Sequence, residues 1–457
     1  MSSLSRRSLL NSLLAAGAAT AAWPVLGANA AGEVDVVIIG AGAAGIAAAR
    51  RVAAANKRFA LLEAGPRLGG RCATDSKIFG VPYDLGAHWI HNPDSNPLAK
   101  AATGFDVYAA PRTQTLRVGA RPARDSELEA YLAAILRSHR GMSDLGKAKT
   151  DFPASRLLPK DLFDWQSTVE FMLGPYATGK DLADISAFDM ARAVERESEA
   201  FCRQGYGALL TKLGTGFGAQ LSTPVEAILW GNKLAVDTPK GNFIARAIIV
   251  TVSTNVLTSD KIEFIPPLPK RQLDAAAKLS LGSYDHIALE MPGNPLGLQK
   301  DDIVFERADG TKTAALLANV SGTDLHLVDV AGNFGRELSG QGEAAMIAFA
   351  GDWLASLFGS NAKRAIRRSH ATRWNADPLT LGAMSAAAPG SADARKILME
   401  PLGGRVWFAG EAVHETQWGT VNGAWESGTR AAEAALRKLG ALSDSGDDKP
   451  AKRRRHR

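Results

Sequence analysis

Three glycines near the start of the chain, Gly40, Gly42 and Gly45, follow the spacing Gly-x-Gly-x-x-Gly. An apolar run precedes them and an alanine-rich run follows, so the sequence predicts a strand, a tight turn and a helix. In this order the glycines let the backbone approach a pyrophosphate, and the N–H groups at the helix start bind it. Glu63 ends the next apolar run, where a carboxylate can bind a ribose hydroxyl. Together these residues predict a dinucleotide-binding site.

Two further motifs combine glycines with a charged side chain. Gly69 and Gly70 precede Arg71, and such a turn lets the backbone and a guanidinium approach an anion. The same residues could equally form a surface turn with a solvated arginine. Gly410 and Glu411 come before a glycine-rich helix start, a second place where the backbone can approach an anionic ligand. The alternative is that Glu411 only caps a helix.

Through these motifs and others in the same order, the chain resembles the FAD-dependent amine oxidase family. That family includes monoamine and polyamine oxidases and the flavin histone demethylases. The matching blocks are 40–45, 69–71, 205–209, 223–228, 247–252, 264–269, Trp374 with Asp377-Pro378, and 408–428. The resemblance covers almost all of the chain after residue 30 and is specific for the flavin family, though not for a substrate.

The resemblance implies an α/β fold with two interleaved domains. A Rossmann-like FAD-binding domain would use residues 33–90, 200–285 and 396–440. An α+β substrate domain, a mixed sheet flanked by helices, would use residues 91–199 and 286–395.

The local residue patterns are compatible with this division. Residues 124–200 carry apolar residues at helical spacing, which predicts helices in the substrate domain. Residues 224–252 instead read as strands and turns, with Gly231-Asn232 at the tip of a hairpin.

The resemblance also implies which residues hold FAD. They come from the glycine motifs and the segments around them: Gly40, Gly42, Ala43, Ala44, Gly45, Glu63, Ala64, Gly70, Arg71, Gly86, Ala87, His88, Trp89, Val225, Gly410, Glu411, Thr420, Val421 and Ala424. Val225 would bind the adenine through its main chain, and Glu411 and Val421 would lie beside the ribityl chain and the isoalloxazine ring. Some family members attach flavin to a cysteine that matches the stretch 381–385 here. This stretch has no cysteine, so the resemblance implies non-covalent FAD.

His286 stands where family members usually have a lysine that holds a water near flavin N5. A histidine can hold the same water and titrates near neutral pH, so it could act as a catalytic base toward an ammonium substrate. The alternative is a histidine packed at the start of a strand, with no catalytic role.

The two aromatic rings that form a substrate cage in the family are also missing. The matching positions are Met384 and Thr420, and neither side chain can orient an amine on a π-face. The remaining candidates for walls of the substrate pocket are Trp374, Trp418, Trp89 and His88, each of which could equally pack in the core.

From these features we expect an FAD-dependent oxidoreductase that oxidises the C–N bond of a small-molecule amine to an imine, by hydride transfer to flavin N5. The missing cage keeps a second interpretation open, a flavin dehydrogenase or desaturase with a non-amine substrate. A third is a flavin-binding protein with little catalysis. Loss of the lysine charge predicts slow reaction with oxygen and favours a periplasmic electron acceptor, such as a cytochrome or a quinone.

The first 30 residues have the features of an export signal. Arg6 and Arg7 form a twin-arginine pattern, an apolar segment follows, and Ala28-Asn29-Ala30 resembles a cleavage site. The apolar segment is diluted by alanine and glycine and is short for a membrane span, so we expect no stable membrane insertion. The sequence therefore predicts a bacterial periplasmic protein exported by the twin-arginine route.

Charge and cysteine content exclude other classes. Most of the net charge of +6 sits at the two ends, including a basic tail at 443–457 that we expect to be disordered. The body between them is nearly neutral, so a nucleic-acid partner is not indicated. Cys72 and Cys202 could form one disulfide or stay as two buried thiols, and no Cys/His spacing predicts a metal site.

Overall fold

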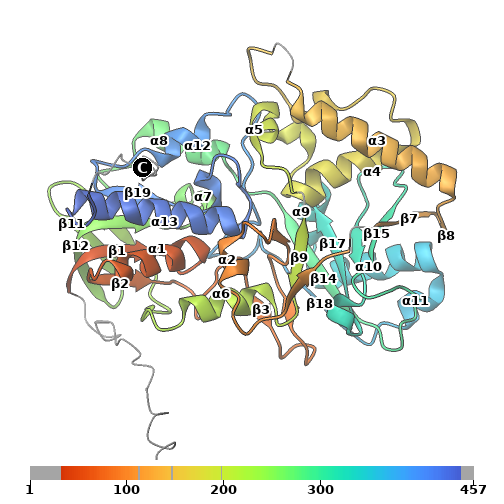
Figure 1. The fold of residues 1–457 in the computed structure, drawn as a ribbon, viewed down its shortest axis with the longest axis horizontal. Coiled ribbons are helices and arrows are strands. Elements are labelled where there is room, and N and C mark those ends of the chain that lie inside the picture. The colour runs from red at the N-terminus through yellow and green to blue at the C-terminus, as the bar shows by residue number, and fades with distance from the viewer. Residues whose placement is uncertain (1–31, 112–113, 146–147, 197, 444–457) are drawn as a thin grey trace, which may run out of the picture.

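The computed structural model describes residues 32–443 except 112–113, 146–147 and 197. The predicted signal segment and all of the basic tail except Ser443 lie outside the described residues. The described chain forms two halves that lie side by side, each built on a seven-stranded sheet (Figure 1). Of the helices in this part of the chain, none is both long and apolar enough to cross a membrane.

The helices lie outside the sheets and connect their strands. In chain order they are α1 (Ala43–Ala54), α2 (Pro97–Lys100), α3 (Asp125–Ser143), α4 (Gln166–Phe171), α5 (Ala187–Arg192), α6 (Tyr206–Gly214), α7 (Thr254–Leu257), α8 (Lys270–Lys278), α9 (Gly332–Gly340), α10 (Glu343–Phe358), α11 (Ser360–Arg364), α12 (Ala394–Met399) and α13 (Val421–Lys438).

The sheet of the first half has the strand order β13-β10-β11-β12-β1-β2, with β19 paired to β12. Its strands are β1 (Glu33–Ile39), β2 (Phe59–Leu62), β10 (Ala227–Leu229), β11 (Leu234–Thr238), β12 (Gly241–Val250), β13 (Glu263–Ile265) and β19 (Val406–Phe408). All of them fall within the segments predicted for the FAD-binding domain. β1 runs parallel to both of its neighbours, so the glycine turn after it leaves the carboxyl edge, where open parallel sheets bind ligands.

Small residues let the helices of this half approach one another closely. α1 and α13 pack together on one face of the sheet, whereas α8 and α12 cover the other face. A Cβ at Gly428 would lie 2.0 Å from the carbonyl oxygen of Ala44, so glycine permits the contact between α1 and α13. The predicted hairpin tip at Gly231-Asn232 joins the antiparallel strands β10 and β11.

The sheet of the second half has the order β18-β14-β17-β16-β15-β7-β8. Its strands are β7 (Gln114–Val118), β8 (Arg121–Pro122), β14 (Tyr284–Glu290), β15 (Ile303–Glu306), β16 (Ala315–Leu317), β17 (Leu325–Ala331) and β18 (Arg368–Ala371). β14 and β17 are antiparallel, and their register places His286 opposite Asp329. α9, α10 and α11 pack on one face of this sheet, and α3 and α4 lie on its other side (Figure 1). The structure thus confirms the predicted mixed sheet flanked by helices.

A three-stranded sheet in the order β5-β9-β6 lies between these two. Its strands are β5 (Ile90–His91), β6 (Val107–Ala109) and β9 (Glu199–Cys202), and a separate pair is formed by β3 (Thr74–Asp75) and β4 (Tyr83–Asp84). The register of β5 on β9 places His91 opposite Glu199. Cys202 ends β9, and it and Cys72 are both buried and free, so the disulfide alternative is wrong.

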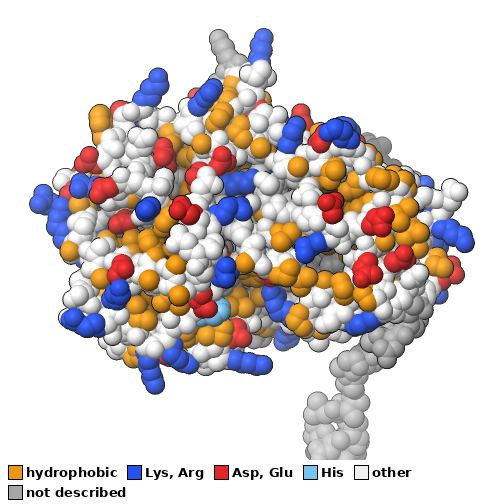
Figure 2. Space-filling view, turned by 180° about the vertical axis from the view of Figure 1, so that it is seen from behind, with side chains coloured by type: hydrophobic (Ala, Val, Ile, Leu, Met, Phe, Trp, Pro, Cys, Tyr) orange, Lys and Arg blue, Asp and Glu red, His pale blue; other side chains and the backbone are white. Residues whose placement is uncertain are grey.

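Among the described residues, the face drawn in Figure 2 has no large patch of one charge sign. Basic and acidic side chains are interspersed there with apolar ones. This agrees with the near-neutral body expected from the sequence.

Candidate active site

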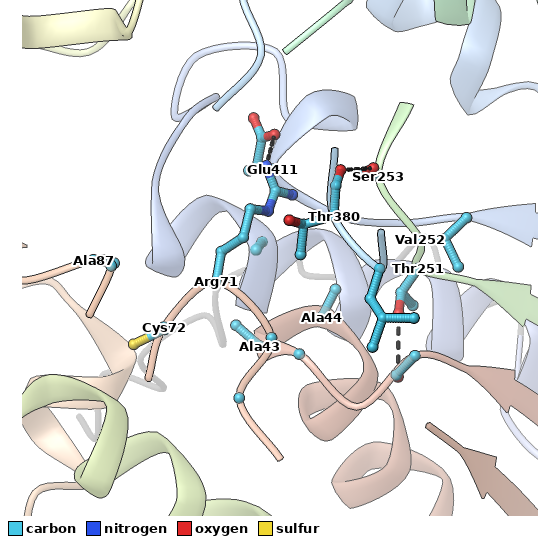
Figure 3. Close-up of a pocket in the computed structure, with 18 of the residues that line it drawn as sticks. Ala43, Ala44, Arg71, Cys72, Ala87, Thr251, Val252, Ser253, Thr380 and Glu411 are labelled. Carbon is cyan, nitrogen blue, oxygen red and sulfur yellow. Dashed lines mark hydrogen bonds and ion pairs between the residues drawn. The ribbon is translucent and has the colours of Figure 1, made fainter. Parts of the chain in front are cut away.

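A cavity of about 590 Å³ is lined by residues from both halves of the molecule. One group of lining residues, called here the cofactor end, comes from the glycine turns and the start of α13 (Figure 3): Gly40, Gly42, Glu63, Gly70, Arg71, Gly410, Glu411 and Val421. A second group, called here the substrate end, comes from the small sheet, from β14 and from the segments near them: His91, Tyr176, Arg196, Tyr284 and His286.

Glycines shape the main chain at the cofactor end. Gly40 has φ +98°, and a Cβ there would lie 2.5 Å from Thr251 Oγ1, so the turn requires glycine. A Cβ at Gly42 would be in ordinary van der Waals contact with the carbonyl oxygen of Gly69, 3.9 Å away, so no neighbouring atom of the described chain excludes it and the glycine leaves the main chain uncovered for a ligand. A cradle of this kind fits the pyrophosphate of FAD.

Glu63 holds the nucleotide-binding turn in place. Its Oε2 accepts a 2.7 Å hydrogen bond from the N–H of Ala41, and its Oε1 accepts one of 2.7 Å from Gly65. Burial raises the pKa of Glu63, and these two N–H groups act in the opposite direction. Because each carboxylate oxygen can accept more than one hydrogen bond, Glu63 keeps capacity for a ribose hydroxyl.

Arg71 and Glu411 join the second glycine turn to the segment before α13 (Figure 3). Arg71 Nη1 donates to Glu411 Oε1 at 3.0 Å and also to the carbonyl of Ala383. Glu411 Oε2 accepts from Ser385 Oγ at 2.7 Å and from the N–H of Gly419 at 2.9 Å. The Arg71 side chain is 25% exposed and lines the cavity, so its remaining donors can reach an anionic ligand there.

The cavity brings together nearly all residues predicted to hold the cofactor. Those that line it are Gly40, Gly42, Ala43, Ala44, Glu63, Ala64, Gly70, Arg71, Gly86, Ala87, His88, Trp89, Val225, Gly410, Glu411, Thr420, Val421 and Ala424. Gly45 lies outside the lining and instead packs under the turn, where a Cβ would be 1.8 Å from the carbonyl oxygen of Gly40. Its role is therefore close packing of helix and turn.

Of the predicted substrate-pocket residues, Trp418 is misplaced. Trp374, Met384, Thr420 and His88 line the cavity, but Trp418 does not. The Trp418 ring is 3% exposed and lies 4.8 Å below the guanidinium carbon of Arg395, in the core of the second half. An indole can pack in a core as well as in a pocket, and here the guanidinium of Arg395 stacks on the Trp418 ring in the core.

The positions that replace the aromatic cage have structural contacts. Thr420 caps α13: its Oγ1 accepts from the N–H of Gly423 at 3.0 Å and donates to the carbonyl of Gln417 at 2.6 Å. Met384 lies between Gly179 and Gly419, close enough that a Cβ at either glycine would touch it. The cavity wall here is apolar and adaptable rather than aromatic.

His286 has a hydrogen-bond acceptor at each ring nitrogen. Nδ1 lies 2.6 Å from Asp329 Oδ1, and Nε2 lies 2.8 Å from the carbonyl oxygen of Gly86. Two acceptors satisfy the ring only when both nitrogens carry protons. Burial opposes the charged form, but the Asp329 carboxylate and the Gly86 carbonyl outweigh it and raise the pKa of His286 to about 9. His286 is therefore a fixed cation at neutral pH, which disfavours the predicted role as a base.

His91, which the sequence did not single out, has the opposite arrangement. Its Nδ1 lies 2.6 Å from Glu199 Oε2, whereas no hydrogen bond from a described residue reaches Nε2. Burial and the charge of Arg196 lower the pKa of His91, so the ring is neutral at neutral pH. With the proton on Nδ1, Nε2 keeps a lone pair, and the residue lines the cavity. The pairing depends on strands 108 residues apart, so no local pattern could reveal it.

Three more residues at the substrate end were not predicted. Tyr176 ends a π-helical turn at Met172–Tyr176, and its ring centroid lies 6.0 Å from that of Tyr284. Tyr284 Oη donates to Asp329 Oδ2 at 2.9 Å. Arg196 follows α5 and lines the cavity, with Nη1 3.4 Å from the carbonyl oxygen of Ala177. The π turn is a local signal of function that sequence patterns do not reveal.

Sequence comparison gives two matches to described families. Residues 183–436 match flavin containing amine oxidoreductase, and residues 38–103 match an NAD(P)-binding Rossmann-like domain. Human lysine-specific histone demethylase 2 is 28% identical, with 87% of this chain and 53% of that protein covered. Probable polyamine oxidase 4 of Arabidopsis thaliana is 26% identical, covering 89% of this chain and 87% of that protein. The chain thus spans about half the length of the histone demethylase.

Solved structures with similar folds include two amine oxidases. Putrescine oxidase bound to putrescine has a TM-score of 0.74 at 19% identity, covering 89% of this chain and 99% of that one. Cyclohexylamine oxidase from Brevibacterium oxydans has a TM-score of 0.73 at 19% identity, with the same coverage. These likenesses support the two-half fold described above.

Proposed function

The chain belongs to the flavin-containing amine oxidoreductase family, whose cofactor is FAD, and we propose that it oxidises the C–N bond of a small amine to an imine. The observation that carries the proposal is a single cavity with two different ends. Its cofactor end has the glycine cradle, Glu63 and Arg71, which suit a dinucleotide. Its substrate end has a neutral histidine lone pair, which suits removal of a proton from an ammonium group.

Bound non-covalently, FAD supplies the acceptor for the hydride that leaves the α carbon. The protein must first make the amine neutral, because the nitrogen lone pair has to form the new C=N bond. His91 Nε2 takes that proton, and Glu199 stabilises the resulting imidazolium through Nδ1–H. The amine thus loses a proton and a hydride, and water then hydrolyses the imine to a carbonyl compound and ammonia.

His286 contributes a positive charge and does not exchange protons in this proposal. The charge removes the reason for expecting slow reaction with oxygen, because that expectation assumed that replacing the lysine left no cation. Oxygen and a periplasmic acceptor are therefore both proposed as oxidants of the reduced cofactor. Stopped-flow reoxidation by air, compared with reoxidation by a cytochrome or a quinone, decides between them.

Anaerobic reduction of the bound flavin by a substrate panel tests the proposed function. We expect bleaching by at least one class among monoamines, polyamines and amino acids. Bleaching by non-amines alone would instead support the dehydrogenase or desaturase. A flavin-loaded protein that no substrate bleaches, with a stable partner in pull-down experiments, would support the flavin-binding protein.

Replacement of His91 tests the proton transfer. His91→Gln should lower kcat/KM by about 100- to 10,000-fold, and the wild-type pH profile should have an acid limb below the ordinary histidine range. His326→Gln is the matched control, because His326 is also buried with a lowered pKa but lies outside the cavity lining. Equal rates for wild type and His91→Gln would assign the proton to another acceptor.

We also propose export to the periplasm by the twin-arginine route. The support is the Arg6-Arg7 pair, the apolar segment and the Ala28-Asn29-Ala30 sequence. Fractionation should recover the protein in the periplasm without residues 1–30. A cytoplasmic protein that keeps this segment would contradict the proposal.

A further inference from the structure

Arg196 uses little of the hydrogen-bonding capacity of its guanidinium. Within the described residues, its single hydrogen bond joins Nη1 to the Ala177 carbonyl at 3.4 Å, and no ion pair connects it to a carboxylate. A guanidinium has five N–H donors in a planar fork that matches the two oxygens of a carboxylate. The Arg196 side chain is exposed and lines the cavity, while surrounding protein lowers its pKa. Its unused donors are therefore accessible to a ligand in the cavity.

Two acids near the substrate end, Glu199 and Asp329, are bound to other groups. Glu199 accepts from His91, and Asp329 accepts from both His286 and Tyr284. His286 and Asp329 are in direct contact, so their charges sum to zero for a distant ammonium group, although the imidazolium remains a cation for a group next to it. Glu199 remains as the counter-charge to Arg196, but beyond ion-pair distance. The substrate end thus has no excess of negative charge that would attract a second ammonium group.

The carboxylates that line the cavity belong to the cofactor end. Glu63 holds the nucleotide-binding turn, Asp377 lies near enough to influence the pKa of Glu63, and Glu411 is paired with Arg71. Among the described residues that line the substrate end, none is acidic. A diamine would therefore have no carboxylate there for its distal ammonium group.

The two tyrosines at the substrate end add no negative charge. Burial raises the pKa of both Tyr176 and Tyr284 well above the ordinary value, so each keeps its O–H at neutral pH. Tyr284 lies close enough to Arg196 for the guanidinium charge to affect the pKa of Tyr284. Tyr284 donates its only proton to Asp329, so the unused donors here are those of the Arg196 guanidinium, which suit an anionic group and not an ammonium group.

We propose that the substrate is an amine that also carries a carboxylate, and that Arg196 binds this carboxylate at the substrate end of the cavity. The proposal rests on the amine oxidation proposed above and names its substrate class. His91 lies in the same end of the cavity and receives the proton of the amino group, so the two groups of an amino acid have separate partners.

Binding of a carboxylate that cannot be oxidised tests the site without turnover. Hexanoate is titrated into the flavin-loaded protein and followed by the change in the flavin spectrum, with hexanol as the neutral analogue. We expect hexanoate to bind at least 10-fold more tightly than hexanol. Equal affinities would overturn the proposal, whether or not the protein oxidises any amine.

A substrate series with a constant carbon chain tests the same point in catalysis. Hexylamine, norleucine, ε-aminocaproate and hexamethylenediamine are compared by anaerobic flavin reduction. Either amino carboxylate should have a kcat/KM about 10- to 100-fold above that of hexylamine. A diamine that outperforms both would overturn the proposal. If none of the four reduces the flavin, the proposed oxidation of these amines fails, and hexanoate binding still decides the role of Arg196.

Variants of Arg196 assign the effect to this residue. Arg196→Gln should remove the kcat/KM preference for the amino carboxylates over hexylamine and lower the affinity for hexanoate about 10- to 100-fold. Arg196→Lys should retain part of the preference and part of the affinity. Arg192→Gln is the matched control, since Arg192 bonds the Ala392 carbonyl outside the cavity lining. Unchanged hexanoate affinity in Arg196→Gln, in a protein with normal flavin content, would overturn the assignment.

Discussion

The two halves of the molecule build their ends of the cavity by different means. In the first half the centre of the binding surface is main chain, shaped by one local turn from Gly40 to Gly45, and the side chains of Arg71 and Glu411 complete it. In the second half side chains form it, and they are brought together by strand register. His286 and Asp329 are 43 residues apart, and His91 and Glu199 are 108 apart.

This difference separates positions whose residue type is fixed from positions where the side chain can change. A Cβ at Gly40 or at Gly45 would clash with neighbouring atoms, so the turn must keep glycine at these two positions. A pair formed across two strands keeps its place when a side chain is exchanged for another of similar size, because the backbone ladder sets the geometry. The first half can therefore retain one cofactor while the second half changes its substrate.

The largest expected effect comes from a methyl group at Gly45. In Gly45→Ala the new Cβ would lie 1.8 Å from the Gly40 carbonyl oxygen, a clash with main chain that only a shift of the turn can relieve. We expect the purified protein to lose its flavin, measured as the ratio of flavin to protein absorbance. Gly340→Ala is the control, because no atom lies within 4 Å of a Cβ there. Full flavin content in Gly45→Ala would contradict the steric account of this half.

The next effect concerns a buried ion pair that joins the two halves. Asp189, on α5, accepts two hydrogen bonds from Arg395, on α12, at 2.8 and 2.7 Å, and both side chains are almost fully buried. Asp189→Ala leaves the guanidinium buried without its partner, so we expect the free energy of unfolding to fall by about 3–5 kcal/mol in urea denaturation. The double variant Asp189→Leu, Arg395→Met should recover much of that loss. Additive losses would show that the two residues act independently.

The same contrast explains how far the sequence predicts the structure. The nucleotide-binding turn, its strand and its helix are local, so the spacing of Gly40, Gly42 and Gly45 was sufficient to place them. The blocks after Gly410 were found through resemblance, and they line the predicted end of the cavity. Trp418 was assigned wrongly because an indole suits a pocket and a core equally well, and Arg395 holds it in the core.

The substrate end was predicted only at isolated positions. His286 was singled out because it replaces a lysine, but its charge depends on Asp329 across the sheet. His91 lies two residues after Trp89, a predicted cofactor residue, and still gave no signal, since Glu199 reaches it through the pairing of β5 and β9. Arg196 lies between α5 and β9 and belongs to neither element, although the sequence predicted helices up to residue 200. Non-local pairing, rather than residue type, decides the chemistry there.

A third prediction tests whether His286 is a fixed cation. Its pKa of about 9 in the folded protein lies above the ordinary value of 6.5, so its contribution to stability is complete below pH 6.5 and is lost as the pH rises through about 9. The shift corresponds to about 3 kcal/mol. In His286→Gln this component should disappear from the plot of unfolding free energy against pH. Tyr284→Phe is the control: it keeps the contact of His286 with Asp329 and should retain the dependence of unfolding free energy on pH. A wild-type unfolding free energy that does not change between pH 6.5 and about 9 would contradict the charge assigned to His286.

The smallest effect is expected at Thr420, where the two halves meet. Its hydroxyl caps α13 by accepting from the N–H of Gly423, so Thr420→Ala should lower the free energy of unfolding by about 1 kcal/mol, and Thr420→Ser should preserve it. Chemical denaturation of the three proteins measures this. Because the hydroxyl is already bonded to main chain on both sides, the alanine variant should retain its order of preference among amines. A changed preference would show that Thr420 helps to select the substrate. The start of α13 would then contribute to substrate selection as well as to cofactor binding.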